Sequence, residues 1–211
     1  IHPDNPEYAS AVEKGIPMLT RAQLLGQIMR NYDTPIAVSG THGKTTTTSM
    51  ISQILLEADA DPTISVGGIL PSIGGNIRVG QSETFVAEAC EYTNSFLSFF
   101  PKISVILNID ADHLDFFKDI DDIRHSFRKF AQLLPADGAL IINADTPHYQ
   151  DIIKDLSCKI ITYGLDHEAQ YQATDITYDK YGHASFTVLK DGRKTGSVYL
   201  KVPGSHNVSN A

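Results

Sequence analysis

The segment Pro35-Ile-Ala-Val-Ser-Gly-Thr-His-Gly-Lys-Thr-Thr-Thr-Thr-Ser49 determines the architecture of this chain. Its apolar beginning, Ile36 to Val38, predicts a buried strand of a parallel sheet. The two glycines predict a tight loop, and the threonine run predicts the first turn of a helix. Strand, glycine loop and helix in this order form a cradle for phosphate, because the free N–H groups and the dipole of a helix N-terminus attract anions.

The loop has the form Gly-x-x-Gly-Lys-Thr, which is shorter than the general phosphate-binding pattern. That pattern carries a glycine five residues before the Gly-Lys pair, where this chain has Val38. Lys44 supplies a positive charge for a phosphate, and Thr45 supplies a hydroxyl for a metal ion. The alternative is a glycine-rich turn without a ligand, which the preceding strand and the following helix disfavour.

Composition and charge exclude several classes of protein. The chain has 211 residues, of which 42% are hydrophobic and 20% charged, as in ordinary globular proteins. Its net charge of −8 argues against binding to nucleic acid. No apolar run approaches the about 18 residues of a membrane span, so we expect no membrane contact. Cys90 and Cys158 fit no metal-binding spacing, and we expect free thiols in the cytoplasm.

Two parts of the chain differ in their pattern. Residues 1–33 predict a helix, a short strand at 16–19 and a second helix, with N-caps at Asp4-Asn5 and at Thr20. The sequence begins without Met and stops at Ala211 inside a predicted helix start, so we expect a fragment of a longer protein. Residues 1–33 would be the tail of a preceding domain with a linker, and residues 34–211 most of the next domain.

From residue 34 onward, short apolar strands alternate with helical segments, which is typical of an α/β fold. After the opening strand, further parallel strands are predicted at 63–66, 84–88, 103–107, 139–142 and 159–163. Helices are predicted at 44–58, 119–134 and 147–156. Alternating segments at 172–178, 184–190 and 197–202 predict three antiparallel strands, with a hairpin at Asp191-Gly192. The predicted fold is a P-loop-type, mainly parallel sheet flanked by helices, with a small antiparallel three-strand addition.

Polar residues follow two of the predicted strands, at the edge where open α/β sheets bind ligands. Glu88 ends one strand, and its position after a buried run makes it a candidate ligand for Mg²⁺, which prefers oxygen. The alternative is a surface acid at a strand end. The segment from Asn108 to Asp115 follows another strand, but it lacks the glycine and glutamate of an EF-hand and the clustered ligands of a zinc site. Its His113 either contacts a second metal ion or a phosphate, or has a structural role.

Two other segments are candidates for ligand contact. Residues 67–76 contain four glycines in ten residues, which predicts either a loop that a substrate approaches closely or a plain surface loop. Near the end of the chain, His206 and Asn207 either contact a nucleotide base or simply cap a helix.

Four motifs together resemble the ATP-dependent Mur ligases of peptidoglycan synthesis. They are Gly40-Thr-His-Gly-Lys-Thr-Thr-Thr-Thr48, Glu88-Ala-Cys-Glu91, Asn108-Ile-Asp-Ala-Asp-His-Leu-Asp115 and Pro203-Gly-Ser-His-Asn-Val-Ser-Asn210. The histidine in the loop and the long threonine run are most similar to the branch that joins L-alanine to UDP-N-acetylmuramate.

The resemblance implies ATP and Mg²⁺ as cofactors, UDP-N-acetylmuramate and L-alanine as substrates, and a cytoplasmic enzyme. It implies three domains: a UDP-binding domain ending in residues 1–33, a central ATPase in residues 34–211, and a C-terminal domain that is absent here. The fragment alone would then be inactive. In the implied reaction the lactyl carboxylate of the sugar attacks the γ-phosphate of ATP, and the alanine amine then displaces phosphate from the acyl phosphate.

The resemblance also implies roles for individual residues. The implied ATP contacts are Gly40, Thr41, His42, Gly43, Lys44, Thr45, Thr46, His206, Asn207 and Asn210. The implied metal ligands are Thr45, Glu88 and His113, and the implied catalytic residues are Lys44, Glu88 and His113. The loop at Gly74, Gly75 and Asn76 resembles one that approaches the UDP-sugar.

The chain departs from the family pattern at Cys90, which stands where many members have an aspartate, so an essential carboxylate is excluded there. Arg128 and Lys129 lie near the place where other Mur ligases carry a carbamylated lysine, which the L-alanine branch generally lacks, and we assign none. Two alternative functions remain open. One is a ligase that attaches a tripeptide to the same sugar nucleotide, and the other is a non-catalytic nucleotide-binding module.

Overall fold

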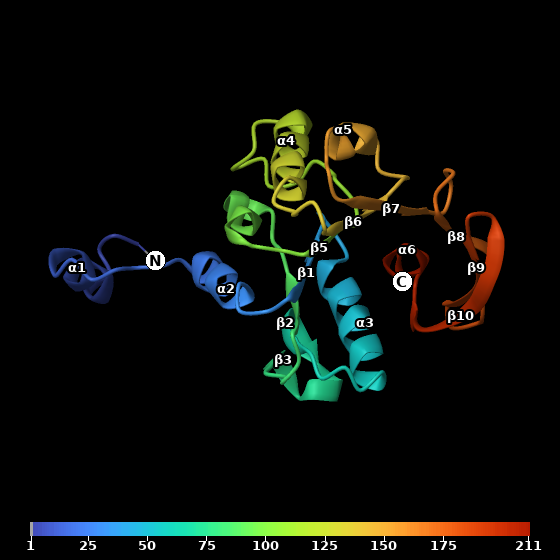
Figure 1. The fold of residues 1–211 in the computed structure, drawn as a ribbon, viewed down its shortest axis with the longest axis horizontal. Helices are drawn as coiled ribbons and strands as arrows, with labels where there is room; N and C mark the ends of the chain where they lie inside the picture. The colour runs from blue at the N-terminus through green and yellow to red at the C-terminus, as the bar shows by residue number, and fades with distance from the viewer. Residues whose placement is uncertain (1) are drawn as a thin grey trace.

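The computed structural model describes residues 2–211, and its strands in this range form one ten-stranded sheet (Figure 1). The strand order is β10-β9-β8-β7-β6-β5-β1-β4-β2-β3. The central strand β1 (Thr34–Ser39) pairs in parallel with β4 (Thr84–Glu88) on one side and with β5 (Ile103–Ile106) on the other. The predicted mainly parallel α/β sheet is therefore confirmed.

The remaining parallel strands are β2 (Thr63–Leu70), β6 (Ala139–Asn143) and β7 (Lys159–Gly164). The helices are α1 (Pro6–Glu13), α2 (Arg21–Met29), α3 (Lys44–Glu57), α4 (Ile120–Ala131), α5 (Tyr149–Ile153) and α6 (His206–Asn210), with two 3₁₀ segments, η1 (Pro71–Ile73) and η2 (Tyr92–Ser98). In Figure 1, α3 lies on one side of the sheet, and α4 and α5 lie on the other. Among the described helices, none has the length and apolarity needed to cross a membrane.

Neighbouring residues of the central strands supply two different cores, because successive side chains of a strand point to opposite faces. Val38 of β1 packs with Val105 of β5 against Ile51 of α3. Ala37 and Ile106 belong instead to the larger cluster under α4. The apolar run that predicted β1 therefore serves both faces of the sheet.

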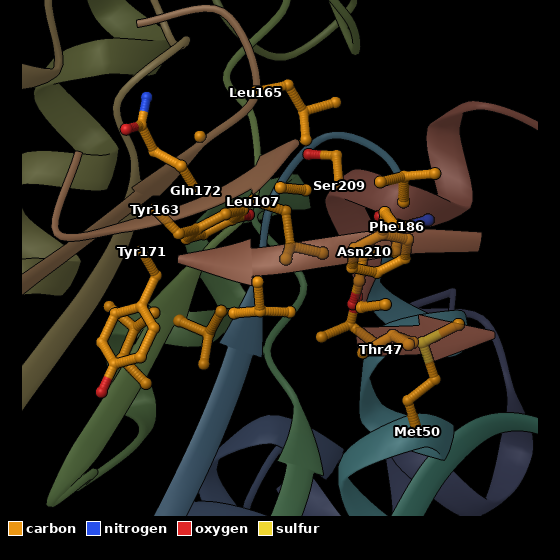
Figure 2. Close-up of a pocket in the computed structure, with 18 of the residues that line it drawn as sticks. Thr47, Met50, Leu107, Tyr163, Leu165, Tyr171, Gln172, Phe186, Ser209 and Asn210 are labelled. Atoms are coloured by element: carbon orange, nitrogen blue, oxygen red, sulfur yellow. The ribbon is translucent and has the colours of Figure 1, made fainter. Parts of the chain in front are cut away.

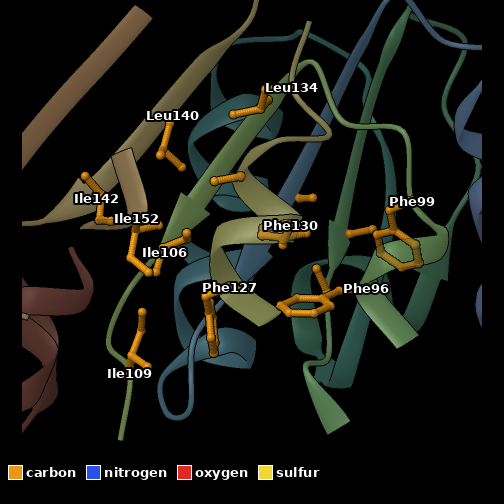
Figure 3. Close-up of a cluster of buried hydrophobic side chains, with 14 of the residues drawn as sticks. Phe96, Phe99, Ile106, Ile109, Phe127, Phe130, Leu134, Leu140, Ile142 and Ile152 are labelled. Atoms are coloured by element: carbon orange, nitrogen blue, oxygen red, sulfur yellow. The ribbon is translucent and has the colours of Figure 1, made fainter. Parts of the chain in front are cut away.

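An aromatic group at the centre of the larger cluster joins α4 to η2 (Figure 3). The ring of Phe96 in η2 stacks on that of Phe130 in α4, with centroids 4.6 Å apart and planes 4° from parallel. Phe127 meets Phe96 edge-on at 5.3 Å. All three side chains are completely buried. This packing places the chain that leaves β4 against the body of the domain.

The three antiparallel strands are confirmed as β8 (Tyr171–Tyr178), β9 (His183–Lys190) and β10 (Arg193–Pro203). The hairpin between the last two turns at Asp191-Gly192, where both residues have positive φ, 49° and 73°. This is the backbone that Asp-Gly favours in a tight hairpin. β8 also pairs in parallel with β7, so the addition continues the main sheet.

Three details of the sequence-based prediction are wrong. The strand predicted at 63–66 continues to Leu70, because β3 (Gly75–Arg78) pairs with it and turns most of the predicted loop at 67–76 into an edge hairpin. The helix predicted at 147–156 is confined to α5, since the backbone has positive φ at both His148 and Asp155. The segment between α1 and α2 forms no strand in the described residues.

The first two helices differ in how they contact the rest of the chain. Helix α1 buries none of its residues, whereas α2 buries Gly26 and Met29. Gly26 lies so close to η2 that a Cβ atom there would be 2.0 Å from the Ser98 carbonyl oxygen. The predicted N-caps at Asn5 and Thr20 are confirmed, and Thr20 forms a reciprocal capping box with Gln23.

Asp145, just after β6, holds the turn that leads from β7 to β8. Its carboxylate accepts hydrogen bonds from the backbone N–H groups of Leu165 (2.6 Å), Asp166 (3.2 Å) and His167 (2.8 Å). Burial raises the pKa of Asp145, but these bonds and the His167 ring outweigh it, so that the pKa is lower than usual. The ionised carboxylate therefore fastens the antiparallel strands to the parallel sheet.

Replacing Phe130 by alanine should lower the free energy of unfolding by about 3–5 kcal/mol, because it removes a fully buried ring and leaves a cavity. Phe100 is the matched control, since this residue is 44% exposed and the guanidinium group of Arg30 lies over its ring. Phe100→Ala should cost about 1 kcal/mol or less. Urea denaturation of the three proteins measures both values, and equal losses would contradict the packing described here.

Asp145→Asn should lower the free energy of unfolding by about 1–2 kcal/mol at pH 7, because hydrogen bonds to a charged acceptor are stronger than those to a neutral one. A carboxyl group with a lowered pKa in the folded state stabilises above its unfolded pKa, about 3.9, and this contribution disappears as the pH falls through the folded value. The difference in free energy of unfolding between Asp145→Asn and the unaltered protein should therefore be smaller at pH 2 than at pH 7, as denaturation at both pH values would measure. A difference independent of pH would show that the charge has no part in it.

Candidate nucleotide and metal site

The glycine loop connects β1 to α3 at the centre of the sheet's carboxyl edge. Gly43 is the N-cap of α3 and has φ of +85°, in the left-handed region where side chains are disfavoured. A Cβ atom at Gly43 would also lie 2.3 Å from the side-chain oxygen of Asn210. Helix α3 then begins at Lys44, so its free N–H groups face the loop. The strand, loop and helix predicted from the opening motif are confirmed.

The segment after β5 clamps this loop in place. The side chain of Asn108 accepts a hydrogen bond from the N–H of His42 (2.7 Å) and donates one to the His42 carbonyl (3.0 Å). The N–H of Asp110 donates to the hydroxyl of Thr41 (2.9 Å). Asn108 opens the motif that ends at Asp115, but the sequence alone predicted no role for it. Only the pairing of β1 with β5 reveals that it braces the loop.

Lys44 directs its ammonium group back onto the loop and onto a buried acid. Nζ donates to the carbonyl of Gly40 (2.6 Å), to that of Thr41 (3.0 Å) and to Oε1 of Glu91 (3.2 Å). Glu91 is 2% exposed, and its Oε2 lies 3.0 Å from Nζ. Glu91 was not predicted as a site residue, although it closes the Glu88-Ala-Cys-Glu91 motif. A charged residue in an irregular segment carries no periodic signal of burial.

Glu88 and Thr45 bring two oxygen atoms together beside Lys44. The hydroxyl of Thr45 donates to Oε2 of Glu88 at 3.2 Å, and the N–H of Gly67 in β2 donates to Oε1. A Cβ atom on Gly67 would lie 2.6 Å from Oε2 of Glu88. Glycine at position 67 thus lets β2 approach the carboxylate and donate a hydrogen bond to it.

The donor set fits Mg²⁺. Two adjacent ligands of an octahedral Mg²⁺ at 2.0–2.1 Å are separated by about 3.0 Å, close to the observed 3.2 Å between Thr45 and Glu88. Within residues 2–211, no three or more His, Cys, Asp or Glu side chains gather as a metal cluster. Two protein oxygens can suffice for Mg²⁺, because it usually takes few ligands from protein and the others from water and phosphate.

His113 lies at the same edge of the sheet, next to Glu91. Its Nε2 is 3.8 Å from Oε1 of Glu91, and its backbone has a positive φ of 53°. The ring of Tyr92 lies 4.6 Å from that of His113, centroid to centroid. Tyr92 in turn donates its hydroxyl to Asp115 at 2.8 Å, and this hydrogen bond raises the pKa of Tyr92. The segment Glu91–Tyr92 therefore positions both Lys44 and His113.

The C-terminal helix α6 lies beside the loop. Asn207 and Asn210 are 7% and 9% exposed, and the amide of Asn210 donates to Oδ1 of Asn207 (3.1 Å). The hydroxyl of Thr47 in α3 donates to the Asn210 carbonyl (3.0 Å). The two asparagines thus connect α6 to the loop helix, while His206 is exposed. Their contact with ATP stays a prediction.

The loop expected near a UDP-sugar lies on the β2–β3 hairpin. Gly74 ends η1 with φ of +67°, Gly75 begins β3, and Asn76 is exposed. Its contact with a sugar nucleotide stays a prediction.

A cavity of about 400 Å³ lies between α3, β7 and the antiparallel strands (Figure 2). Met50, Tyr163, Phe186 and Val198 are among the side chains that line it. Burial raises the pKa of the Tyr163 hydroxyl far above its usual value. An apolar cavity of this kind is unsuited to phosphate, which needs N–H groups and cations. The loop at Lys44 offers both kinds of group, and Asn210, which lines the cavity, lies next to Gly43 of that loop.

A parallel strand, a glycine loop with lysine and threonine at a helix N-terminus, and an acid at the end of the neighbouring strand define a nucleotide-binding α/β domain of the P-loop type. The chain belongs to the Mur ligase family, since the model of the Mur ligase middle domain matches residues 38–211. The family predicted from the four motifs is thereby confirmed.

Curated relatives are similar over the whole chain. A UDP-N-acetylmuramate–L-alanine ligase of Agathobacter rectalis is 64% identical over 211 residues, which is 100% of this chain and 46% of that protein. The ligase of the same name from Lachnospira eligens is 60% identical, with 100% and 46% covered. The chain therefore spans about half the length of the curated relatives it matches.

Solved structures of the family have the same fold. A UDP-N-acetylmuramate-alanine ligase of Thermotoga maritima matches 100% of this chain and 47% of its own, with a TM-score of 0.84 and 28% identity. A UDP-N-acetylmuramate:L-alanyl-gamma-D-glutamyl-meso-diaminopimelate ligase of Neisseria meningitides matches with a TM-score of 0.86 and 28% identity, over 100% of this chain and 68% of its own.

Gly67→Ala should raise the Mg²⁺ concentration needed for half-maximal activity of the full-length protein by about tenfold, or ~1.4 kcal/mol. The added methyl group meets the Glu88 carboxylate and displaces it from Thr45. Gly196→Ala is the matched control, because a Cβ atom there meets nothing within 4 Å. Titration of activity with Mg²⁺ measures both, and an unchanged requirement in Gly67→Ala would contradict this role for Glu88.

Proposed function

We propose that the whole protein joins L-alanine to the lactyl carboxylate of UDP-N-acetylmuramate with cleavage of ATP to ADP and phosphate, in the synthesis of peptidoglycan precursors. The observation that carries the proposal is the Thr45–Glu88 oxygen pair beside the Lys44 ammonium, at the end of a phosphate-binding loop. The relatives at 60% and 64% identity, both named for this ligation, support the choice of substrates.

In this proposal the chain's own residues bind and orient the triphosphate. The N–H groups of residues 43–46 donate to phosphate oxygens, since those of Thr41 and His42 are bonded to Asn108. Lys44 balances the negative charge that the γ-phosphate carries during transfer. Thr45 and Glu88 hold Mg²⁺, with His113 facing a second ion, and the metal neutralises the phosphate oxygens when bound. His206, Asn207 and Asn210 contact the adenosine, and Gly74, Gly75 and Asn76 approach the sugar nucleotide.

The reaction then takes two steps. An oxygen of the lactyl carboxylate attacks the γ-phosphorus, the bond to the bridging oxygen breaks, and ADP leaves. The amine of L-alanine attacks the acyl carbon, phosphate leaves with the bonding electron pair, and the amine loses a proton. The protein contributes mainly position and charge, because the two reactants must be held in contact while water is kept away.

A second candidate function is the attachment of a tripeptide to the same sugar nucleotide. The Neisseria structure, named for such a ligation, matches this fold as closely as the L-alanine ligase does. The high sequence identity to the two curated relatives, both named as L-alanine ligases, favours L-alanine as the acceptor. The loop lysine together with the Thr45–Glu88 pair disfavours a non-catalytic binding module, because binding alone does not need a metal held at the γ-phosphate.

We further propose that residues 1–33 are the end of a UDP-binding domain with its linker, that residues 34–211 form the ATPase domain, and that a further domain completes the enzyme. The start of the family match at residue 38 supports the boundary. The side chains of Val12, Ile16 and Leu19 are more than half exposed, which suits a surface covered by another domain. The cytoplasm is the proposed location, and the free thiols of Cys90 and Cys158 agree with it.

Lys44→Ala in the full-length protein should lower kcat by at least a thousandfold, about 4 kcal/mol in barrier, because the γ-phosphate charge loses its counter-ion. Lys102→Ala is the matched control, since Lys102 pairs with Asp137 before β5 begins, at the other edge of the sheet. ADP release with UDP-N-acetylmuramate is compared for L-alanine, glycine, L-serine and a tripeptide. Turnover of Lys44→Ala within tenfold of the unaltered protein, or a preference for the tripeptide, would overturn the corresponding part of the proposal.

A further inference from the structure

Glu91 is a buried carboxylate for which the proposed reaction has no use. It is 2% exposed, and within residues 2–211 Lys44 is the lysine or arginine in ion-pair distance of it. Its Oε1 accepts the hydrogen bond from Lys44, whereas its buried Oε2, 3.0 Å from Nζ, accepts none of suitable geometry. A buried charge is stable only when it is compensated, so Glu91 depends on Lys44.

Lys44 is also fully engaged in this arrangement. An ammonium group has three protons, and those of Lys44 go to the carbonyls of Gly40 and Thr41 and to Glu91. A phosphate that enters the loop competes with Glu91 for the same cation. If the phosphate draws the ammonium away, the carboxylate is left buried without a counter-ion.

The local charge makes this competition unfavourable for a bare nucleotide. Lys44 contributes one positive charge, and Glu88 and Glu91 contribute two negative charges, so the three groups sum to −1. A polyphosphate adds further negative charge next to these carboxylates, and solvent screens it little from Glu91, which is almost fully buried. A divalent cation that arrives with the nucleotide reverses the balance, because it brings two positive charges to the Thr45–Glu88 pair.

We propose that Glu91 is a positioning residue that makes the loop select nucleotide carrying a divalent cation over metal-free nucleotide. It holds the Lys44 ammonium on the loop and opposes phosphates that come without a metal. This inference rests on the proposed binding of nucleotide at Lys44 and adds to it the form of nucleotide that the loop accepts.

The test measures ADP binding to the full-length protein by calorimetry, once with excess Mg²⁺ and once with EDTA. The unaltered protein should bind ADP at least tenfold more tightly with Mg²⁺. Glu91→Gln keeps the size of the side chain and removes its charge, so it should bind metal-free ADP at least fivefold more tightly than the unaltered protein does. Its affinity for ADP with Mg²⁺ should change less than threefold. Circular dichroism verifies the fold of each variant.

Two further variants complete the experiment. Glu91→Asp keeps the charge and should retain the preference for Mg²⁺ within threefold, and it keeps the proposal testable if Glu91→Gln does not fold. Asp121→Asn makes the same change of net charge on the surface of α4, where the side chain is 82% exposed, and should leave both affinities unchanged.

Each other outcome counts against the inference. If Glu91→Gln weakens binding equally with and without Mg²⁺, or leaves the ratio unchanged, Glu91 is only a structural residue. Loss of the preference in Glu91→Asp would show that charge is not what matters. If the unaltered protein binds ADP under neither condition, the proposed nucleotide site itself fails, and this result is distinct from the others.

Discussion

The ammonium group of Lys44, held at the carboxyl end of the central strand, is the charge around which the neighbouring strands and loops are arranged. Three acceptors fix it: two carbonyls of its own loop and the buried carboxylate of Glu91. The loop carbonyls come from the turn after β1, and Glu91 comes from the chain that leaves β4. The position of one charge therefore depends on two neighbouring strands and on the loop between β1 and α3.

The order of the sheet explains why these groups meet. β1 lies between β4 and β5, and β2 lies beyond β4. Because parallel strands all end at the same edge, Glu88, Asn108 and Gly67 reach the loop from three different strands. Their contacts differ, since Glu88 faces Thr45, Asn108 braces His42, and Gly67 holds Glu88. The candidate phosphate and metal site is therefore built from segments that are distant in sequence.

Packing far from the loop also affects the geometry of the site. The stacked rings of Phe96 and Phe130 hold η2 against α4, and η2 begins directly after Glu91. Within η2, Thr93 and Asn94 both have positive φ, which is costly for residues other than glycine. The hydroxyl of Ser126 in α4 donates a hydrogen bond to the side chain of Asn94. The aromatic core thus stabilises a backbone turn that places Glu91 against Lys44 and Tyr92 against His113.

The amino-acid sequence alone was sufficient for the features whose signals are local. The apolar run before Gly40, the glycines and the threonine run established the strand, loop and helix. The Asp191-Gly192 turn and the alternating strands around it established the antiparallel addition, and four motifs established the family. Glu88 was found because it ends an apolar strand, and its contact with Thr45 is observed.

Features that depend on contacts across the sheet emerged only from the folded chain. Glu91 was missed because its burial results from the turn at η2 and from its pairing with a lysine 47 residues earlier. The glycine-rich segment at 67–76 was predicted as a loop because glycine disfavours strands, yet pairing with β3 and the need to approach Glu88 override this preference. Local sequence preferences predict which segments of this chain form helices and strands. Which charged groups meet depends on the close approach of the strands, because burial and ion pairing are properties of the assembled fold.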